Sequence, residues 1–282
     1  MGQSPAGGLC QVVGRQYARA MHAGCGRGLR AAFLVSGLVA GASCVKHYPL
    51  DLSLWEEVTG SSGEQAGDGA VWRVSLDGQA VSVDQINPGA ALQYDPRPRP
   101  GFSASRGGTA FTAVDDGWLI AFNKGDLGAA LSWFSWDGKQ SYLISGDPVV
   151  EFFSRSDGHY AVRGNDHGTS WGSVIRIARP EPQGRWTVSG VLDLPQAPWA
   201  VSVLRDDTVL VTLSTSLVSL GPSWSLTTLI KKAPWGGLAP NSSVLSADQS
   251  HLYIGMRQVV AEVDLTSARL RLLAPSQALR AR

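Results

Sequence analysis

The sequence is poor in cysteine. Its 282 residues include only Cys10, Cys25 and Cys44, and the first two lie in a segment that we expect to be removed. A mature chain with one cysteine can form neither an internal disulfide framework nor a cysteine-ligated metal site. Hydrophobic residues make up 44% of the chain, and all ten tryptophans lie beyond residue 50. We therefore expect the fold to depend on its apolar core and its strand pairing.

The sequence also lacks a surplus of basic residues. Residues 1–43 contain four arginines and no acidic residue, which leaves 20 basic against 23 acidic side chains in the remainder. A net charge of −3 does not favour the neutralisation of phosphates on which nucleic-acid binding depends. The composition therefore argues against nucleic acid as a partner.

No apolar run is long enough to span a bilayer as a helix. The longest, Ala31–Ala42, has 12 residues, whereas a spanning helix needs about 20. Arg27 and Arg30 precede this run and small residues follow it, which is the order of an export signal. Met21 would begin a signal of ordinary length.

The small residues after the apolar run end in a cysteine. Gly41-Ala42-Ser43-Cys44 resembles a bacterial lipobox, in which the cysteine becomes the first residue and carries a diacylglycerol. The pattern differs at Gly41, where leucine is usual, and ordinary cleavage after Ala40-Gly41-Ala42 is the alternative. The resemblance implies a lipid on Cys44, removal of residues 1–43, and a tether over residues 44–65.

Helical periodicity is missing between this tether and the polar C-terminus, and short β-type runs separated by turn residues replace it. Aspartate-containing turns that lead into a strand recur at Asp116, Asp157, Asp206 and Asp248, at intervals of 41, 49 and 42 residues. This is the period of a four-stranded propeller blade. The sequence predicts an all-β chain with a β-propeller over residues 66–276.

A second apolar element recurs five times. Its copies begin at Val71, Leu131, Val174, Leu217 and Val259. Five copies predict five blades, within a range of four to six, followed by a polar tail over residues 277–282. We expect the segment after Ser62 to complete the terminal blade, because a ring must join its last blade to its first. The alternative is an irregular β-sandwich.

One turn resembles a known propeller motif. Gly164-Asn-Asp166-His-Gly168-Thr-Ser170-Trp171 is similar to the Asp-box of sialidase-like propellers, with Ser170 in place of threonine. The resemblance implies that the Asp166 carboxylate accepts backbone N–H groups, that Gly168 has a positive φ, and that the Trp171 indole packs between strands. Ser135-Trp-Asp137-Gly resembles a degenerate second copy. The Asp-box is structural, and no arginine triad marks a sialidase site.

A second resemblance involves Asn241. Pro240-Asn241-Ser-Ser, followed by Asp248-Gln-Ser-His-Leu-Tyr253, is similar to the repeat of gluconolactonase-like and NHL-type propellers. In the lactonases the matching asparagine binds a divalent metal in the central channel, which implies Ca²⁺ at Asn241 and further oxygen ligands, for which Glu57, Glu151 and Asp193 are candidates. The alternative is that Asn241 bonds its own turn at the start of a strand.

Motifs that define a reaction are lacking: there is no Gly-x-Ser-x-Gly elbow, phosphate-binding loop or dinucleotide fingerprint. We expect most tryptophans to pack between sheets, and the Pro198-Trp199 and Pro234-Trp235 pairs to link blades.

These patterns together favour an exported β-propeller that binds an envelope protein or glycan. We expect it in the periplasm, anchored by lipid with the outer membrane favoured, and without a cofactor. Ordinary signal cleavage would instead leave it soluble in the periplasm or secreted. The alternatives are a calcium-dependent, lactonase-like hydrolase and a carbohydrate binder.

Overall fold

The computed structural model describes residues 46–58, 69–86, 99–124 and 127–280. The chain divides into two compact units, Met1–Cys44 and Val45–Arg282, and every described residue belongs to the second. The predicted signal segment and Cys44 therefore lie outside the described residues. Within those residues, no helix has the length and hydrophobicity needed to cross a membrane.

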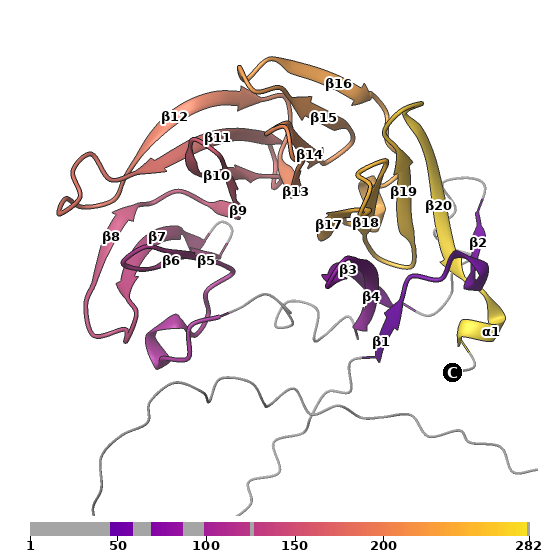
Figure 1. Ribbon diagram of the computed structural model, residues 1–282, viewed down its shortest axis with the longest axis horizontal. Helices are drawn as coiled ribbons and strands as arrows, with labels where there is room; N and C mark the ends of the chain where they lie inside the picture. The colour runs from indigo at the N-terminus through magenta and orange to yellow at the C-terminus, as the bar shows by residue number, and fades with distance from the viewer. Residues whose placement is uncertain (1–45, 59–68, 87–98, 125–126, 281–282) are drawn as a thin grey trace, which may run out of the picture. The chain divides into compact units, whose positions relative to one another are not determined.

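The described strands form five antiparallel sheets, arranged as the blades of a β-propeller (Figure 1). Blade 1 contains β3 (Val71–Asp77), β4 (Ala80–Ile86) and β1 (Lys46–Pro49). Blade 2 contains β5 (Ala110–Val114), β6 (Gly117–Asn123), β7 (Ala129–Ser135) and β8 (Ser141–Ser145). Blade 3 contains β9 (Val149–Arg155), β10 (Gly158–Asn165), β11 (Trp171–Ala178) and β12 (Thr187–Leu194).

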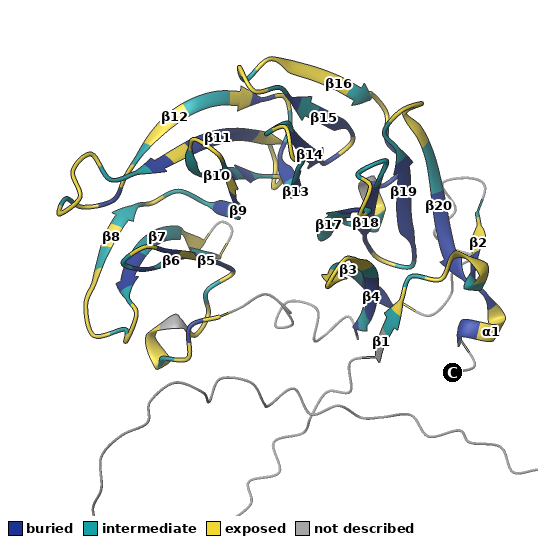
Figure 2. Ribbon diagram, in the orientation of Figure 1, coloured by how far each residue is buried: buried dark blue, intermediate teal, exposed yellow. Residues whose placement is uncertain are grey.

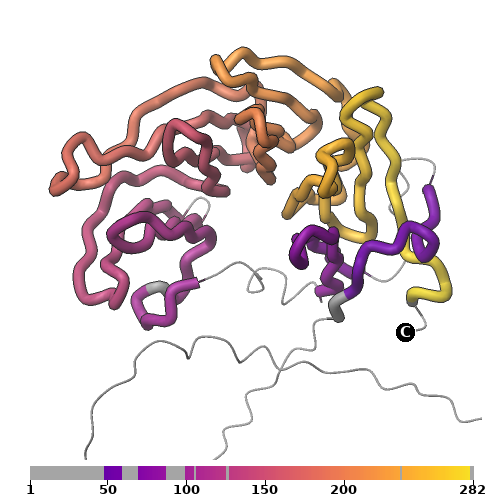
Figure 3. The backbone as a smooth tube through the Cα atoms, in the orientation of Figure 1, coloured from indigo at the N-terminus to yellow at the C-terminus, as the bar shows by residue number. Residues whose placement is uncertain are grey.

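Blade 4 contains β13 (Pro198–Val203), β14 (Val209–Leu213), β15 (Leu217–Leu220) and β16 (Leu226–Ile230). Blade 5 contains β17 (Ser242–Leu245), β18 (His251–Gly255), β19 (Val260–Asp264), β20 (Arg269–Pro275) and β2 (Trp55–Glu57). The first strands of the blades line the centre, where β5 contacts β9, β9 contacts β13, β13 contacts β17, and β17 contacts β3 (Figures 1 and 3). The predicted all-β class and the five blades are confirmed.

Two strands come from the segment that we expected to be a tether. β1 pairs with β4 in blade 1, and β2 adds a fifth strand to blade 5 by pairing with β20. Trp55, on β2, is 6% exposed and meets Trp72 edge to face, with 5.1 Å between ring centroids. The strand that extends the last blade thus lies before Ser62, whereas the sequence placed it after that residue. The burial of Trp55 explains why this short strand is held.

The predicted repeat corresponds to a structural repeat. Asp116, Asp157, Asp206 and Asp248 each lie in the turn between the first and second strands of a blade. One assignment was wrong: the element that begins at Val71 was grouped with the third strands, but β3 is the first strand of blade 1.

The cause of this error is that Asp-Gly occurs both in the hairpin between the first two strands of a blade and in the hairpin between its last two strands. Asp77-Gly78 joins the first two strands of blade 1, and Asp137-Gly138 joins the last two of blade 2. Gly78 and Gly138 have φ values of +64° and +71°, a conformation that glycine adopts without strain. The dipeptide therefore identifies a hairpin without saying which one.

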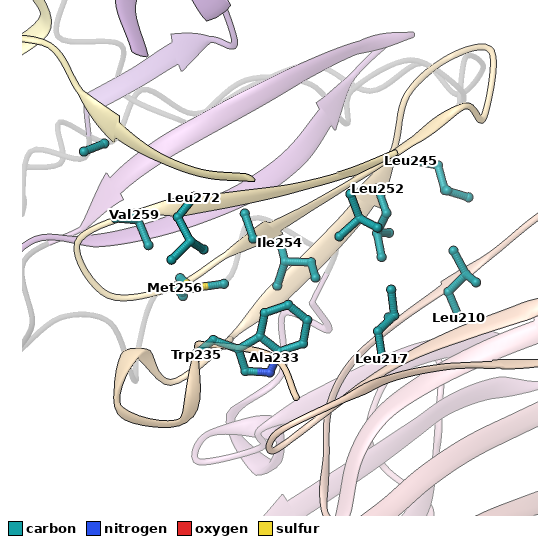
Figure 4. Packing of buried hydrophobic residues seen from close by; sticks show 13 residues of the cluster. Leu210, Leu217, Ala233, Trp235, Leu245, Leu252, Ile254, Met256, Val259 and Leu272 are labelled. Carbon is teal, nitrogen blue, oxygen red and sulfur yellow. The ribbon is translucent and has the colours of Figure 1, made fainter. Parts of the chain in front are cut away.

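The core consists of apolar clusters between successive blades. Figure 2 shows buried residues along middle strands such as β14 and β19, and exposed ones along the outer strand β16. Between blades 4 and 5, Leu217 packs with Ile254 and with Trp235 from the connecting link (Figure 4). Trp235 is fully buried, and its indole Nε1 donates to the carbonyl of Leu213 at 3.0 Å. The predicted linking role of Pro234-Trp235 is confirmed.

Other positions differ from the predicted pattern. Pro198-Trp199 lies within β13 and is not a link between blades. Trp136 and Trp171 are 53% and 40% exposed, although most tryptophans are buried or half-buried as expected. The predicted polar tail contains the short helix α1 (Gln277–Arg280), whose Leu279 is 3% exposed and packs with the core of blades 1 and 5.

Candidate functional site

Asn241 joins two blades through its side chain. Its Nδ2 donates to the carbonyl of Trp72 in blade 1 at 3.1 Å, and its Oδ1 accepts from the Ser242 hydroxyl at 2.9 Å. The Ser242 Oγ in turn accepts the Val74 N–H at 2.9 Å. Both polar atoms of the Asn241 amide are therefore used within the protein, in bonds that hold blade 5 to blade 1.

The other suggested metal ligands lie apart from Asn241. Glu57 is on β2 at the outside of blade 5, where Arg271 lies 4.0 Å away. Glu151 accepts the Val201 N–H at 2.8 Å between blades 3 and 4, and Asp193 is exposed on β12. Within the described ranges, no group of three or more histidine, cysteine or acidic residues could hold a metal ion. These residues do not form a ligand set for calcium, which prefers six to eight oxygen ligands.

The segment that resembles an Asp-box connects β10 to β11. Gly168 has a φ of +78°, as the resemblance implied. Asn165 Oδ1 accepts the His167 N–H at 3.1 Å, while Asp166 is exposed. The Ser170 hydroxyl oxygen accepts the Ala197 N–H at 3.0 Å, which ties the turn to the start of the next blade. Trp171 is 40% exposed, and its indole is not enclosed between strands.

Two other turns use a related arrangement of hydrogen bonds to an aspartate. In the turn after β7, the Asp137 carboxylate accepts from the Ser135 hydroxyl at 2.8 Å and from the Lys139 N–H at 3.1 Å. In the turn after β17, Asp248 accepts from the Ser246 hydroxyl at 2.6 Å and from the Ser250 N–H at 3.1 Å. These bonds lower the pKa of both aspartates, so both carboxylates are ionised at neutral pH.

Hydrogen bonds join blade 3 to blade 4, and blade 4 to blade 5, through the turn between the first and second strands of each blade. Asp207, at φ +65°, accepts the N–H of Ser156 from the preceding blade at 3.0 Å. Gln249, at φ +61°, accepts the N–H of Arg205 through its Oε1 at 3.2 Å. In both cases the residue that follows the repeated aspartate accepts a hydrogen bond from the previous blade. The hydrogen bonds from Ser156 also lower the pKa of Asp207.

A cleft of about 390 Å³ opens beside these turns, between blades 1, 4 and 5. Its aliphatic wall consists of Leu76, Val201, Val203, Val244 and Leu245. Leu76 is 53% exposed at the rim, whereas Leu245 also belongs to the core between blades 4 and 5 (Figure 4). The apolar floor of the cleft is thus continuous with the packed interior.

The polar groups of the cleft lie at its base and its rim. The Ser202 and Ser243 hydroxyl oxygens are 2.8 Å apart. Arg205 is exposed, and its guanidinium donates to the Ala247 carbonyl at 2.6 Å. Gln79 is exposed on the opposite turn. A guanidinium carries five N–H donors, so Arg205 has further donors for a ligand.

The charge around the cleft is mixed. Arg205 is the only charged residue among those that line it. Asp77 is exposed at the end of β3, and Asp206 and Asp248 are exposed in the adjoining turns. The cleft therefore presents one cation inside a rim of carboxylates.

Sequence reasoning did not identify this cleft. Its residues come from three blades, and each belongs to an ordinary strand or turn. The one available signal was Arg205, which is the only basic residue that begins one of the four repeated aspartate turns.

No family model matches the chain, and no curated protein is similar to it in sequence. Its likenesses are to solved structures, as follows. The virginiamycin B lyase from Staphylococcus aureus is 14% identical over 60% of this chain and 55% of that chain, with a TM-score of 0.41. A candidate 6-phosphogluconolactonase from Bacteroides uniformis is 11% identical over 75% and 70%, with a TM-score of 0.41.

The extracellular domain of a candidate one-component system from B. thetaiotaomicron is 10% identical over 79% of this chain and 29% of that chain, with a TM-score of 0.42. The chain spans little more than half the length of the lyases that it matches. These likenesses concern the fold and carry no argument about ligands or reactions.

Proposed function

We propose that this protein is an exported, lipid-anchored β-propeller of the bacterial envelope that binds another protein in the cleft between blades 1, 4 and 5, without catalysing a reaction. One observation carries this proposal: the cleft joins an aliphatic wall to the guanidinium of Arg205. A protein segment with one aliphatic side chain and one carboxylate satisfies both features. The lipid on Cys44 and the periplasmic location rest on the resemblance to a lipobox.

The chemistry of the cleft also suggests what flanks that segment. A carboxylate facing Arg205 would form charge-assisted hydrogen bonds. Basic residues on either side of it would face Asp77, Asp206 and Asp248. Glycans usually stack on aromatic side chains, and no aromatic residue is among those that line the cleft. A protein partner is therefore favoured over a glycan at this position.

Affinity capture from detergent-solubilised envelopes tests the proposal. Leu76→Asp and Arg205→Glu place an acidic group in the cleft, and we expect each to reduce capture of the partner at least tenfold. Matched controls are Leu143→Asp and Arg269→Glu, since their side chains are exposed outside the cleft. Equal capture by all four variants, or no protein captured by the unmodified chain, would contradict the proposal.

A second candidate function has an observation of its own. Trp136 is 53% exposed on blade 2 and meets Trp118 edge to face, with 5.7 Å between ring centroids. Asp137 and Lys139 lie beside it and supply polar groups. An exposed indole with flanking polar groups is suited to a sugar ring. Carbohydrate binding that is lost in Trp136→Ala, and retained in Leu76→Asp, would favour this function.

A further inference from the structure

The first strand of each blade lines the centre of the propeller, and the two ends of these inner strands differ in charge: the end with the first turns is acidic, and the opposite end is basic. The first turn of every blade has at least one aspartate in it or beside it, and the set comprises Asp77, Asp115, Asp116, Asp157, Asp206, Asp207 and Asp248. Arg205 is the only basic residue within these turns, and Arg155, the last residue of β9, lies beside one of them. The cleft opens at this acidic end.

The opposite end carries exposed basic side chains. They are Lys124 after β6, Lys231 and Lys232 between β16 and β17, and Arg257 between β18 and β19. In the part of the chain that the structure describes, none of these four side chains has an ion-pair or hydrogen-bond partner.

Few acidic residues oppose this charge. In the described loops at the basic end, Asp147 forms an ion pair with Arg163, and Asp166 is exposed beside His167. We call the side chains of Lys124, Lys231, Lys232 and Arg257 the basic surface.

The N-terminal segment of the chain joins the propeller at this same end. Arg257 forms an isolated bridge with Val71, the first residue of β3, and Val71 pairs with Ile86, the last residue of β4. β1 runs antiparallel to β4, and its first residue, Lys46, pairs with Gln85. Cys44 precedes Lys46 by two residues, which span at most about 7 Å. A lipid on Cys44 would therefore be held close to the basic surface.

We propose that the basic surface rests on the anionic headgroups of the membrane, so that the acidic end and its cleft face away from the bilayer. This inference rests on the lipid anchor of the proposed function. Basic residues near a bilayer are attracted to anionic lipids, and the attraction falls off within a Debye length. A single lipid signal gains stability from such a second contact. The aspartate turns would be repelled by the same headgroups.

The mature chain offers a direct test, because Cys44 is its only cysteine. A chain that begins at Cys44 is coupled through this thiol to maleimide lipids. The vesicles contain either phosphatidylcholine alone or phosphatidylcholine with about 30% phosphatidylglycerol. Hydrogen exchange then reports which peptides are protected. Coupling places the lipid at residue 44 whether or not cells attach one there.

We expect the vesicles with phosphatidylglycerol to slow exchange several-fold in residues 231–241 and 256–258, but not in the turns at Asp206 and Asp248. High salt should remove this protection, and so should the triple variant Lys231→Glu, Lys232→Glu and Arg257→Glu. The control is Lys139→Glu with Arg269→Glu: Lys139 lies between β7 and β8, Arg269 begins β20, and their side chains are 83% and 70% exposed outside the basic surface. This control should retain the protection.

Three outcomes would overturn the inference. Equal exchange on both kinds of vesicle would refute a membrane-facing basic surface, and protection of the aspartate turns would reverse the orientation. A response to soluble polygalacturonate but not to phosphatidylglycerol would assign the surface to an anionic polysaccharide. The mass of the native protein separately decides the anchor, because an unmodified Cys44 would refute that part of the proposed function.

Discussion

Asp116 holds blades 2 and 3 together through three bonds. Its Oδ1 accepts from the indole Nε1 of Trp133 at 2.9 Å and of Trp186 at 3.1 Å, and its Oδ2 accepts from Arg179 at 2.7 Å. Trp133 and Trp186 are 8% and 6% exposed. One carboxylate thus satisfies two buried indole donors and a largely buried guanidinium. We predict that Asp116→Ala strongly destabilises the propeller.

The magnitude follows from the groups that lose their acceptor. A buried donor left without a partner costs about 1–3 kcal/mol, so the loss of the acceptor for two indoles reduces the free energy of unfolding by about 2–6 kcal/mol. Asp116→Asn keeps an acceptor oxygen for the indoles, but it removes the charge and replaces the oxygen that accepts from Arg179 with an NH2 group. This variant should cost about 1–2 kcal/mol.

Urea unfolding followed by tryptophan fluorescence measures these differences. Asp115→Ala is the matched control, because Asp115 also pairs with Arg179 but its side chain is 64% exposed. An exposed ion pair contributes about 0–1 kcal/mol. The reasoning would be refuted if Asp116→Ala lay within about 1 kcal/mol of this control, or if Asp116→Asn were as unstable as Asp116→Ala.

Three further predictions concern packing, metal and pH. Gly164→Ala should cost about 1–3 kcal/mol in urea unfolding, because its Cβ would lie 2.4 Å from a backbone oxygen, whereas Gly190→Ala has open space and should be near neutral. Millimolar Ca²⁺ should leave the Tm unchanged, because the Asn241 amide is already bonded; a rise that Asn241→Ala abolishes would favour the hydrolase. Burial and Glu262 raise the pKa of Tyr253 from 10.0 to about 12. Between these two values the tyrosine is ionised only in the unfolded state, so the free energy of unfolding should fall as the pH rises. An equal fall in Tyr253→Phe would contradict this cause.

The blade repeat was predictable because its signal is local. Four aspartates in turns between β-type runs gave both the class and the period. Two of them bond their own turns: Asp206 accepts the Thr208 N–H at 3.0 Å, and Asp248 accepts the Ser250 N–H at 3.1 Å. The identity of the first strand in blade 1 was not predictable, because Asp-Gly occurs in both types of hairpin. Pairing of β2 with β20 was also hidden, since it depends on the burial of Trp55 against residues distant in sequence.

The cleft could not be predicted for a related reason. Leu76, Arg205 and Val244 come from three blades. Apart from the position of Arg205 at the start of an aspartate turn, nothing in their sequence neighbourhoods distinguishes them from other turn and strand residues. Conversely, Asn241 stood out because its segment resembles a lactonase repeat. Its amide joins two blades, which is a role that sequence similarity does not reveal.

Photo-crosslinking in living cells tests the central claim most directly. Benzoylphenylalanine replaces Leu76 at the rim of the cleft or, as a control, Leu143 on β8, and both of these leucines are exposed. The account predicts one covalent adduct with an envelope protein from position 76, its loss in Arg205→Glu, and no adduct of the same mass from position 143. The same adduct from both positions, or from position 143 alone, would contradict a binding site in the cleft.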